Sequence, residues 1–269
     1  MALPLPRSLS PSKVSAFKDC ALAFRFSAID KVPEPASVHT LKGTLVHSAL
    51  ERLYWRHPPG SRSPDAAAAE LASVWRKAED DGSFTVLELG DAEIAALRRQ
   101  CETLVAADFA IEDPDSVNAV GVELTVEAEV GGLRLRGIID RLDVTSTGEL
   151  VVVDYKTGRV PAVHHEHSRL GGVQFYALLC EAVLGVRPAQ VRLHYLAEPV
   201  TIESVPSDQT LRGLKLRTGA VWQAIERACA SEDFRPRPSN LCRWCAFQTW
   251  CPAYGGDPDK APRAALVTT

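Results

Sequence analysis

The sequence lacks the long hydrophobic runs that mark proteins entering or crossing a membrane. Residues 1–11 contain no extended apolar core, so we expect no signal peptide. No later stretch approaches the length of apolar sequence needed to span a bilayer. These absences predict a cytoplasmic protein with no membrane contact.

A nucleotide-binding loop and a basic overall charge are also missing. No G-x-x-x-x-G-K-[ST] pattern occurs, so the chain carries no ATP-driven motor of its own. The formal net charge is −4, so any surface for a polyanion would have to be a local basic patch. Hydrophobic residues make up 46% and charged residues 24% of the chain, which is ordinary for a globular protein.

Two adjacent predicted strands carry charged side chains in apolar surroundings. The strand over 133–143 places Asp140 after an apolar pair, and the strand over 150–158 places Asp154 after three valines. An ionised carboxylate in such a place must find a cation or hydrogen-bond donors. Asp154 and Lys156 are two residues apart, so their side chains emerge on the same face. Two carboxylates beside an ammonium group suit a hard divalent cation and the water that it activates.

These strands resemble the PD-(D/E)XK nuclease superfamily, and within it the RecB/AddB-type exonuclease branch. The segments that carry the resemblance are Gly137–Asp143, which reads GIIDRLD, and Asp154–Gly158, which reads DYKTG. The resemblance implies an α/β (α+β) fold with a restriction-endonuclease-like core, in which helices flank a central mixed sheet. It also implies a metal-dependent DNA nuclease, specifically an exonuclease of DNA repair or recombination that acts on single-stranded DNA or DNA ends.

The resemblance assigns roles to the charged residues of these strands. Asp140 and Asp154 would hold Mg²⁺ or Mn²⁺, helped by the backbone carbonyl of Tyr155. Lys156 would position or deprotonate the attacking water and stabilise the charge that grows on the phosphate.

A histidine on a predicted helix is a further candidate ligand. His47 lies on an amphipathic helix over 43–55, where a lone histidine is more often a packed or surface residue. The pattern G-x-x-x-H-x-x-L-E changes this expectation, because in the resembled family the histidine reaches the metal. Glu51 is four residues further on the same helix, and it could orient His47 or simply be solvated.

Glutamates alternate with apolar residues on a predicted strand over 120–130, which is typical of a half-buried strand. Glu127 and Glu129 are expected to form a solvated face. Glu123 is the exception, because the family often places a glutamate near the metal.

A predicted helix over 168–182 contains Gln174 and Tyr176, which are candidate catalytic residues by the same resemblance. The family sets its glutamine four residues before the tyrosine, and that position here is Gly172. Gln174 is only two residues before Tyr176, so the two side chains would point in different directions.

Cysteines form the second strong pattern. Cys242, Cys245 and Cys251 give a C-x2-C-x5-C spacing, which in a cytosolic chain indicates a metal site rather than disulfides. Such sites usually take four ligands, and Cys20 is the best fourth candidate. The spacing alone fits zinc and iron–sulfur about equally. The resemblance favours a [4Fe–4S] cluster that joins the N- and C-terminal segments.

The other three cysteines, Cys101, Cys180 and Cys229, fall in predicted helices and are expected to be small buried hydrophobic residues. The helix predicted over 208–231 and the segment after it concentrate positive charge. Such runs are usually solvated, but in a nuclease they are candidate phosphate contacts. The candidates are Arg212, Lys215, Arg217 and Arg243.

We predict one nuclease domain over 1–269. Its parts are N-terminal helices over 1–60, a helical insert over 61–115, the core over 116–200, a C-terminal helix and cysteine segment over 201–255, and a disordered tail over 256–269. The alternative function is a non-catalytic DNA-binding accessory subunit of a helicase–nuclease complex, and a helicase could be a separate partner of either.

Overall fold

The computed structural model describes residues 2–160 and 163–262. Their internal contacts divide the chain into two compact units. The first unit comprises Met1–Pro35, Glu127–Arg136 and Arg212–Thr269, and the second comprises Ala36–Val126 and Gly137–Leu211. The single domain over 1–269 stays a prediction.

Five strands form one sheet, in which neighbouring strands follow the order β1-β2-β3-β4-β5. β3 pairs antiparallel with β2 and parallel with β4, and β4 pairs antiparallel with β5, so the sheet is mixed as predicted. The strands are β1 (Ala119–Val130), β2 (Leu133–Val144), β3 (Leu150–Lys156), β4 (Gln190–Tyr195) and β5 (Val200–Ser204). Gly131 and Gly132 join β1 to β2 with φ angles of 60° and 78°, which explains glycine at both positions of this two-residue turn.

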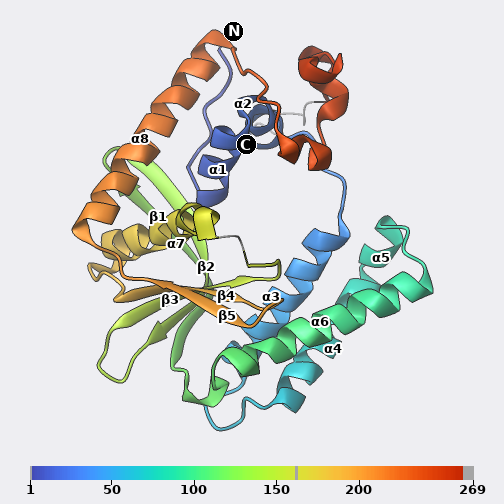
Figure 1. Cartoon of the computed structure of the whole chain (residues 1–269), viewed down its shortest axis with the longest axis vertical. Coiled ribbons are helices and arrows are strands. Elements are labelled where there is room, and N and C mark those ends of the chain that lie inside the picture. The colour runs from blue at the N-terminus through green and yellow to red at the C-terminus, as the bar shows by residue number, and fades with distance from the viewer. Residues whose placement is uncertain (1, 161–162, 263–269) are drawn as a thin grey trace. The chain divides into compact units, whose positions relative to one another are not determined.

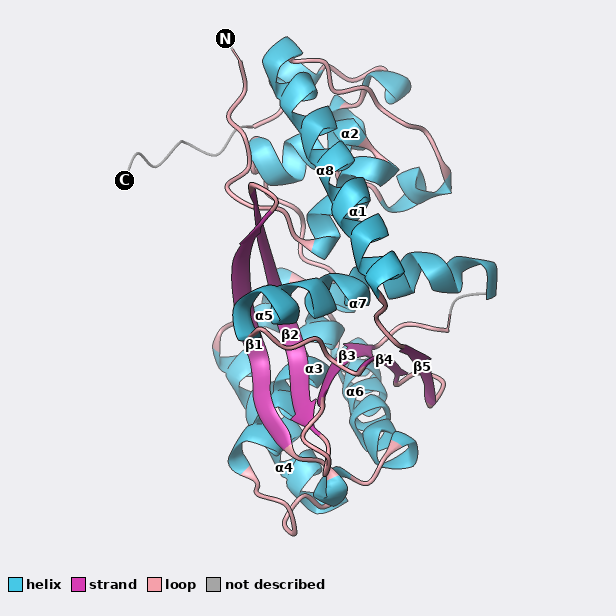
Figure 2. Cartoon of the chain, turned by 90° about the vertical axis from the view of Figure 1, so that its left-hand side faces the viewer, coloured by secondary structure: helices cyan, strands magenta, loops and turns pink. Residues whose placement is uncertain are grey.

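Three long helices of the second unit pack together on one side of β3. They are α3 (Val38–Arg56), α4 (Pro64–Asp80) and α6 (Asp91–Ile111), with the short α5 (Ser83–Val86) between the last two. Their apolar faces form one hydrophobic cluster with Val151, Val153 and Tyr155, which are alternate residues of β3. α7 (Val163–Leu184) packs against β3 and β4 on the other side of the sheet (Figure 1). Figure 2 shows the strands between these helices.

The N-terminal residues of the first unit form α1 (Pro11–Asp19) and α2 (Ala21–Phe24), followed by a π-helical turn over Arg25–Ile29. α1 begins at Pro11 because the Ser10 hydroxyl accepts a hydrogen bond from the Lys13 N–H and proline is favoured in the first turn. α8 (Asp208–Ser231) is followed by short 3₁₀ helices over Asn240–Trp244, Gln248–Trp250, Pro252–Tyr254 and Pro258–Lys260. The last of these falls in the tail predicted over 256–269, of which 263–269 lie outside the described residues.

Several local features differ from the sequence predictions. β5 was not predicted, and α3 begins at Val38 rather than Gly43, because the Ser37 side chain caps the helix by accepting from the Thr40 N–H. Cys101, Cys180 and Cys229 are buried in α6, α7 and α8, as predicted.

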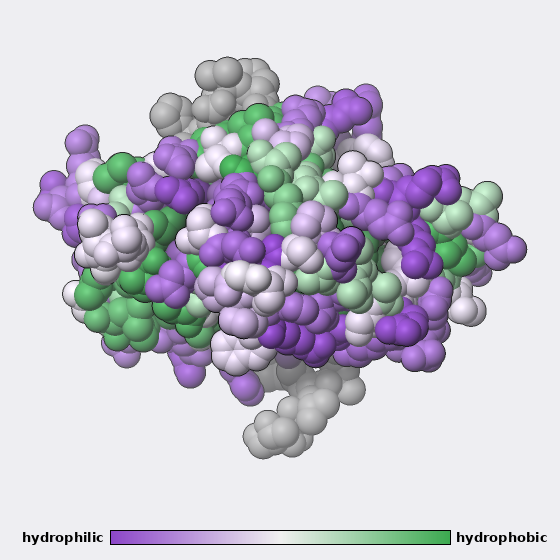
Figure 3. Space-filling model, turned by 90° about the horizontal axis from the view of Figure 1, so that it is seen from below, coloured by the Kyte–Doolittle hydropathy of each residue, from purple (hydrophilic) through white to green (hydrophobic). Residues whose placement is uncertain are grey.

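No helix in the described ranges is long and apolar enough to cross a bilayer. Figure 3 shows one face of the surface, where hydrophilic and hydrophobic patches are interspersed.

Candidate active site

A histidine and two carboxylates converge in the second unit. His47 comes from α3, Glu123 from β1 and Asp140 from β2. The His47 Nδ1 atom lies 3.5 Å from Asp140 Oδ2 and 3.7 Å from Glu123 Oε1. One potential ligand atom of each residue lies within 4.8 Å of the others, which is a spacing that one metal ion could bridge.

Asp154 and Lys156 of β3 complete this group. The register of β2 and β3 ends at Arg141↔Val153, and just beyond it Asp140 Oδ2 accepts a hydrogen bond of 2.7 Å from the Tyr155 N–H. The Asp140 carboxylate thus accepts a hydrogen bond from the backbone of Tyr155, the residue between Asp154 and Lys156. The Lys156 ammonium group forms an ion pair with Asp154. We call His47, Glu123, Asp140, Asp154 and Lys156 the acidic site.

The acidic site has an excess of negative charge. Three carboxylates face one ammonium group, which leaves −2 when His47 is neutral. Burial raises the pKa of Asp154 to about 6, and the nearby Asp140 adds to this while Lys156 opposes it. Burial alone would lower the pKa of His47, but the neighbouring carboxylates of Asp140, Glu123 and Asp154 raise it to about 10. A proton on His47 and a bound divalent cation are therefore alternatives for balancing this charge.

Glu123 interrupts the extended backbone of β1. Its φ angle of 43° lies in the left-handed region, which is costly for a residue with a Cβ atom. Its carboxylate is nevertheless held near His47, on a strand where Glu127 and Glu129 are exposed. The strained backbone at the one glutamate of β1 that reaches the acidic site fits a functional role for its side chain.

The structure places Tyr176 and Gln174 of α7 in different surroundings. Tyr176 lies against Gly137, where an added Cβ atom would be 2.7 Å from its ring. Burial raises the pKa of Tyr176, and the charges of Asp154 and Asp140 raise it further, so its hydroxyl stays protonated. The Gln174 amide donates a hydrogen bond of 3.2 Å to the Ser204 hydroxyl on β5.

A second polar group, which the sequence analysis did not identify, lies on the other face of β3, among α3 and α6. Its centre is Arg141, which pairs in register with Val153 and is fully buried. We call this group the arginine cluster, and its members are Tyr54, Asp108, Glu112, Arg141, Asp143, Tyr155 and His194. A signal was present, because Arg141 and Asp143 are alternate residues of one predicted strand, soon after the apolar pair Ile138 and Ile139, and a buried charge needs a partner.

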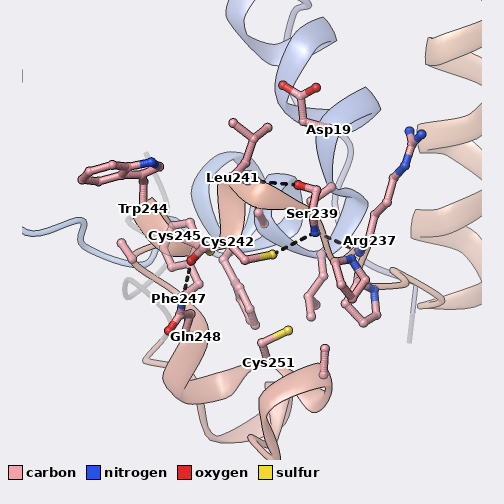
Figure 4. A pocket seen from close by; sticks show the side chains of 18 of the residues that line it. Asp19, Arg237, Ser239, Leu241, Cys242, Trp244, Cys245, Phe247, Gln248 and Cys251 are labelled. Carbon is pink, nitrogen blue, oxygen red and sulfur yellow. Dashed lines mark hydrogen bonds between the residues drawn. The ribbon is translucent and has the colours of Figure 1, made fainter.

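The four cysteines predicted as ligands line one cavity of about 270 Å³ in the first unit. Cys20 follows α1, and the other three come from the 3₁₀ segments near the C-terminus (Figure 4). Two sulfurs accept backbone hydrogen bonds of 3.4 Å, Cys20 from the Arg237 N–H and Cys242 from the Ser239 N–H. The hydrogen bond from Ser239 lowers the pKa of Cys242, which favours its thiolate form.

The spacing of these sulfurs is too wide for a single ion. Among the residues that the structure describes, no three cysteine Sγ atoms lie within 4.8 Å of one another. A tetrahedral zinc site with Zn–S bonds of about 2.3 Å would bring its sulfurs to about 3.8 Å. The cavity therefore brings the four cysteines to one place without forming a single-ion geometry.

The four basic candidates for phosphate contacts all lie in the first unit. Arg212, Lys215 and Arg217 are exposed on α8, and Arg243 is exposed between Cys242 and Cys245. Their exposure leaves them accessible to a polyanion.

Comparison with known families gives a match over most of the chain. Residues 8–252 match the family described as the PD-(D/E)XK nuclease superfamily. This range includes every residue of the acidic site and all four cysteines of the cavity.

Individual relatives are more distant. The Gene 69 protein of Mycobacterium phage D29 is 25% identical over 271 residues, which cover 91% of this chain and 96% of that protein. The Gene 69 protein of Mycobacterium phage L5 is 29% identical over 140 residues, which cover 49% of this chain and 44% of that protein. A crystal structure from Eubacterium rectale, described as a candidate exonuclease, aligns over 89% of this chain and 87% of its own, with a TM-score of 0.54 and 13% identity. At that identity the structural likeness shows the fold alone.

Proposed function

The chain belongs to the PD-(D/E)XK nuclease superfamily, and from that premise we propose that it is a metal-dependent DNA nuclease of the RecB/AddB-type exonuclease branch. The observation that carries the proposal is the acidic site, where His47, Asp140 and Glu123 lie within one ion's reach. Superfamily membership supports nuclease activity. DNA as the substrate, action from ends, and a place in repair or recombination are parts of the proposal.

The acidic site fits Mg²⁺ or Mn²⁺. Asp140, Asp154 and His47 would hold the ion, with Glu123 and the Tyr155 carbonyl as further oxygen ligands. The excess charge of −2 at neutral His47 matches a divalent cation, and the imidazole shifts the preference toward Mn²⁺. When bound, such an ion polarises the phosphodiester and lowers the pKa of the attacking water.

The remaining chemistry is assigned to side chains of this site. The Lys156 ammonium group would orient the water and donate to the phosphate oxygen on which negative charge develops. The protonated Tyr176 hydroxyl would be a second donor, and Gln174 would act only after leaving Ser204. Arg212, Lys215, Arg217 and Arg243 would bind the DNA backbone through its phosphates.

A digestion experiment tests the proposal. Purified protein is incubated with end-labelled linear single- and double-stranded DNA and with closed circular DNA, in Mg²⁺, Mn²⁺ or EDTA. We expect metal-dependent loss of linear DNA and survival of circles. Asp154→Asn should be inactive, and Glu129→Gln, an exposed acid on the same strand as Glu123, should match the wild type. Cleavage of circles would contradict exonuclease action, and binding without cleavage would favour the accessory-subunit alternative.

We also propose that Cys20, Cys242, Cys245 and Cys251 hold a [4Fe–4S] cluster, which would join the two ends of the first unit. Their shared cavity supports this proposal, as do the backbone N–H groups that bond two of the sulfurs, because such bonds tune clusters. A [4Fe–4S] cluster is larger than one ion, so it does not need three sulfurs within 4.8 Å of one another.

Metal analysis of protein purified without oxygen tests the cluster. We expect about four iron and four sulfide per chain, with visible absorbance. Cys242→Ser should lose the iron and the sulfide. Cys229→Ser should keep them, because Cys229 is buried in α8 and does not line the cavity. One zinc per chain without iron would contradict the cluster.

A further inference from the structure

Arg141 is a fully buried charged residue of the second unit. Its side chain has no exposed surface, and it lies over the Tyr54 ring at 4.3 Å from the ring centroid. Its Nε and Nη2 atoms donate to the Asp143 carboxylate at 2.9 and 3.0 Å, and its Nη1 atom lies 2.6 Å from Glu112 Oε1. A guanidinium group held by two carboxylates has little freedom to move.

The same guanidinium reaches the strand that carries Asp154 and Lys156. Its Nη1 atom donates a hydrogen bond of 2.5 Å to the hydroxyl of Tyr155, the residue between those two. The Tyr155 N–H in turn donates to Asp140, the residue next to Arg141. The two strands are therefore tied twice at this point, once through a backbone N–H on the side of the acidic site and once through a buried side chain on the other.

We propose that Arg141 is a positioning residue, which fixes Asp140 and the Asp154–Lys156 segment relative to each other through the Tyr155 hydroxyl. The inference rests on the proposed function, since it concerns the geometry of that metal site. A metal site tolerates small displacements of its ligands poorly, and an arginine with both carboxylate partners in place gives Tyr155 a rigid support. Neither Arg141 nor the Tyr155 hydroxyl is a proposed ligand of the ion, whereas the Tyr155 ring contacts the His47 ring edge to face, with centroids 6.1 Å apart.

The chain offers a matched pair of hydroxyl groups for the test. Removing Arg141 itself would leave Glu112 and Asp143 buried without their cation, so loss of the fold would mask any effect on the site. Tyr155→Phe deletes only the acceptor of the Arg141 hydrogen bond. Tyr54→Phe deletes a hydroxyl of the same cluster that bonds Asp108 and Glu112, 2.7 and 3.1 Å away. Each variant deletes one buried hydroxyl group, but only Tyr155→Phe loosens β3.

The experiment measures Mn²⁺ affinity by titration calorimetry, kcat and KM for DNA, and thermal unfolding in the full-length wild type and both variants. We expect Tyr155→Phe to weaken Mn²⁺ binding and lower kcat by about tenfold each, the factor for one modest hydrogen bond. Its KM should be nearly unchanged. Tyr54→Phe should keep both values within about twofold while losing similar thermal stability.

Wild-type Mn²⁺ affinity and kcat in Tyr155→Phe, or equal losses in the two variants, would overturn the inference. The calorimetric titration separates this result from failure of the proposed function. A wild type that binds Mn²⁺ but leaves DNA intact contradicts the nuclease, while the difference in Mn²⁺ affinity between the two variants still decides the role of Arg141.

Discussion

The acidic site and the arginine cluster use neighbouring residues of the same two strands for opposite purposes. Asp140 and Arg141 are adjacent on β2, as are Asp154 and Tyr155 on β3. In the acidic site the side chains of His47 and Lys156 are 27% and 32% exposed, and carboxylates outnumber cations. In the arginine cluster Arg141 is fully buried between the Asp143 and Glu112 carboxylates, and burial raises the pKa of the third carboxyl group, that of Asp108, to about 7. One group is therefore set up to gain a cation from solution, whereas the other already contains its own.

The largest expected effect comes from removing the internal cation. Arg141→Met should lower the free energy of unfolding by about 3–5 kcal/mol, because it leaves two buried carboxylates without a partner. Arg134→Met is the matched control on β2, since its exposed ion pair with Glu127 should contribute no more than about 1 kcal/mol. Urea denaturation measures both. Equal losses in the two variants would remove the distinction between buried and exposed arginines.

The pH dependence of stability tests the protonation of the arginine cluster. Burial raises the pKa of Asp108 from 3.8 to about 7, so the folded form holds this proton more tightly and stability falls as pH rises between these values. The Asp108→Asn variant has no carboxyl group to titrate, so it does not undergo this loss of stability. Its stability relative to the wild type should rise across that range, by on the order of 4 kcal/mol at most.

Burial also lowers the pKa of His194 from 6.5 to about 4, which gives the opposite slope and flattens the wild-type profile. Urea denaturation at several pH values measures the difference between wild type and variant, and His194→Gln is the control that removes the opposing slope. If the stability of the wild type and of Asp108→Asn changed with pH in parallel, the raised pKa of Asp108 would be contradicted.

Binding of a cation from solution to the acidic site should increase the stability of the folded protein. At 100 times its dissociation constant, Mn²⁺ should stabilise the wild type by about 2.7 kcal/mol, because it binds only the folded form. Asp140→Asn should lose most of this gain, since it removes a charged ligand that lies near His47. Glu129→Gln should keep it, as an exposed acid away from the site. Thermal unfolding with and without Mn²⁺ gives the comparison, and an equal gain in all three proteins would place the ion elsewhere.

The smallest effect concerns the close contact between β2 and α7. Gly137→Ala should destabilise the protein by about 1–3 kcal/mol, because its Cβ atom would overlap the Tyr176 ring. Tyr176→Ala removes the ring, so in that background Gly137→Ala should cost less, and the remaining cost comes from Leu179 Cδ1, 3.1 Å from the added Cβ atom. A double-mutant cycle of unfolding free energies measures this coupling, and additive losses would show that the two residues act independently.

Residues of the acidic site could be predicted because their signal is local. Asp140 and Asp154 each follow an apolar run, and Lys156 is two residues further on its strand. The arginine cluster was missed because its partners come from elements far apart in the sequence. Glu112 directly follows α6 and His194 lies on β4, and nothing in either local sequence indicates that Glu112 pairs with Arg141 or that His194 lies 3.8 Å from Glu112.

Segments with weak patterns were also hard to predict. β5 has five residues and few buried side chains, so its alternation gave no clear strand signal. The separation of Gln174 from Tyr176 was predicted from their spacing. The partner of Gln174, the Ser204 hydroxyl, could not be predicted because it lies on that unpredicted strand.

The most direct test of the account is the single-turnover rate at which Lys156→Ala cleaves end-labelled DNA in Mn²⁺. Lys156 is half-buried and bonds Asp154 at the acidic site, so its loss should spare the fold and act on the reaction. We expect this rate to fall by about two to three orders of magnitude, with DNA affinity and thermal stability close to the wild type. Cleavage by Lys156→Ala at the wild-type rate would contradict this expectation.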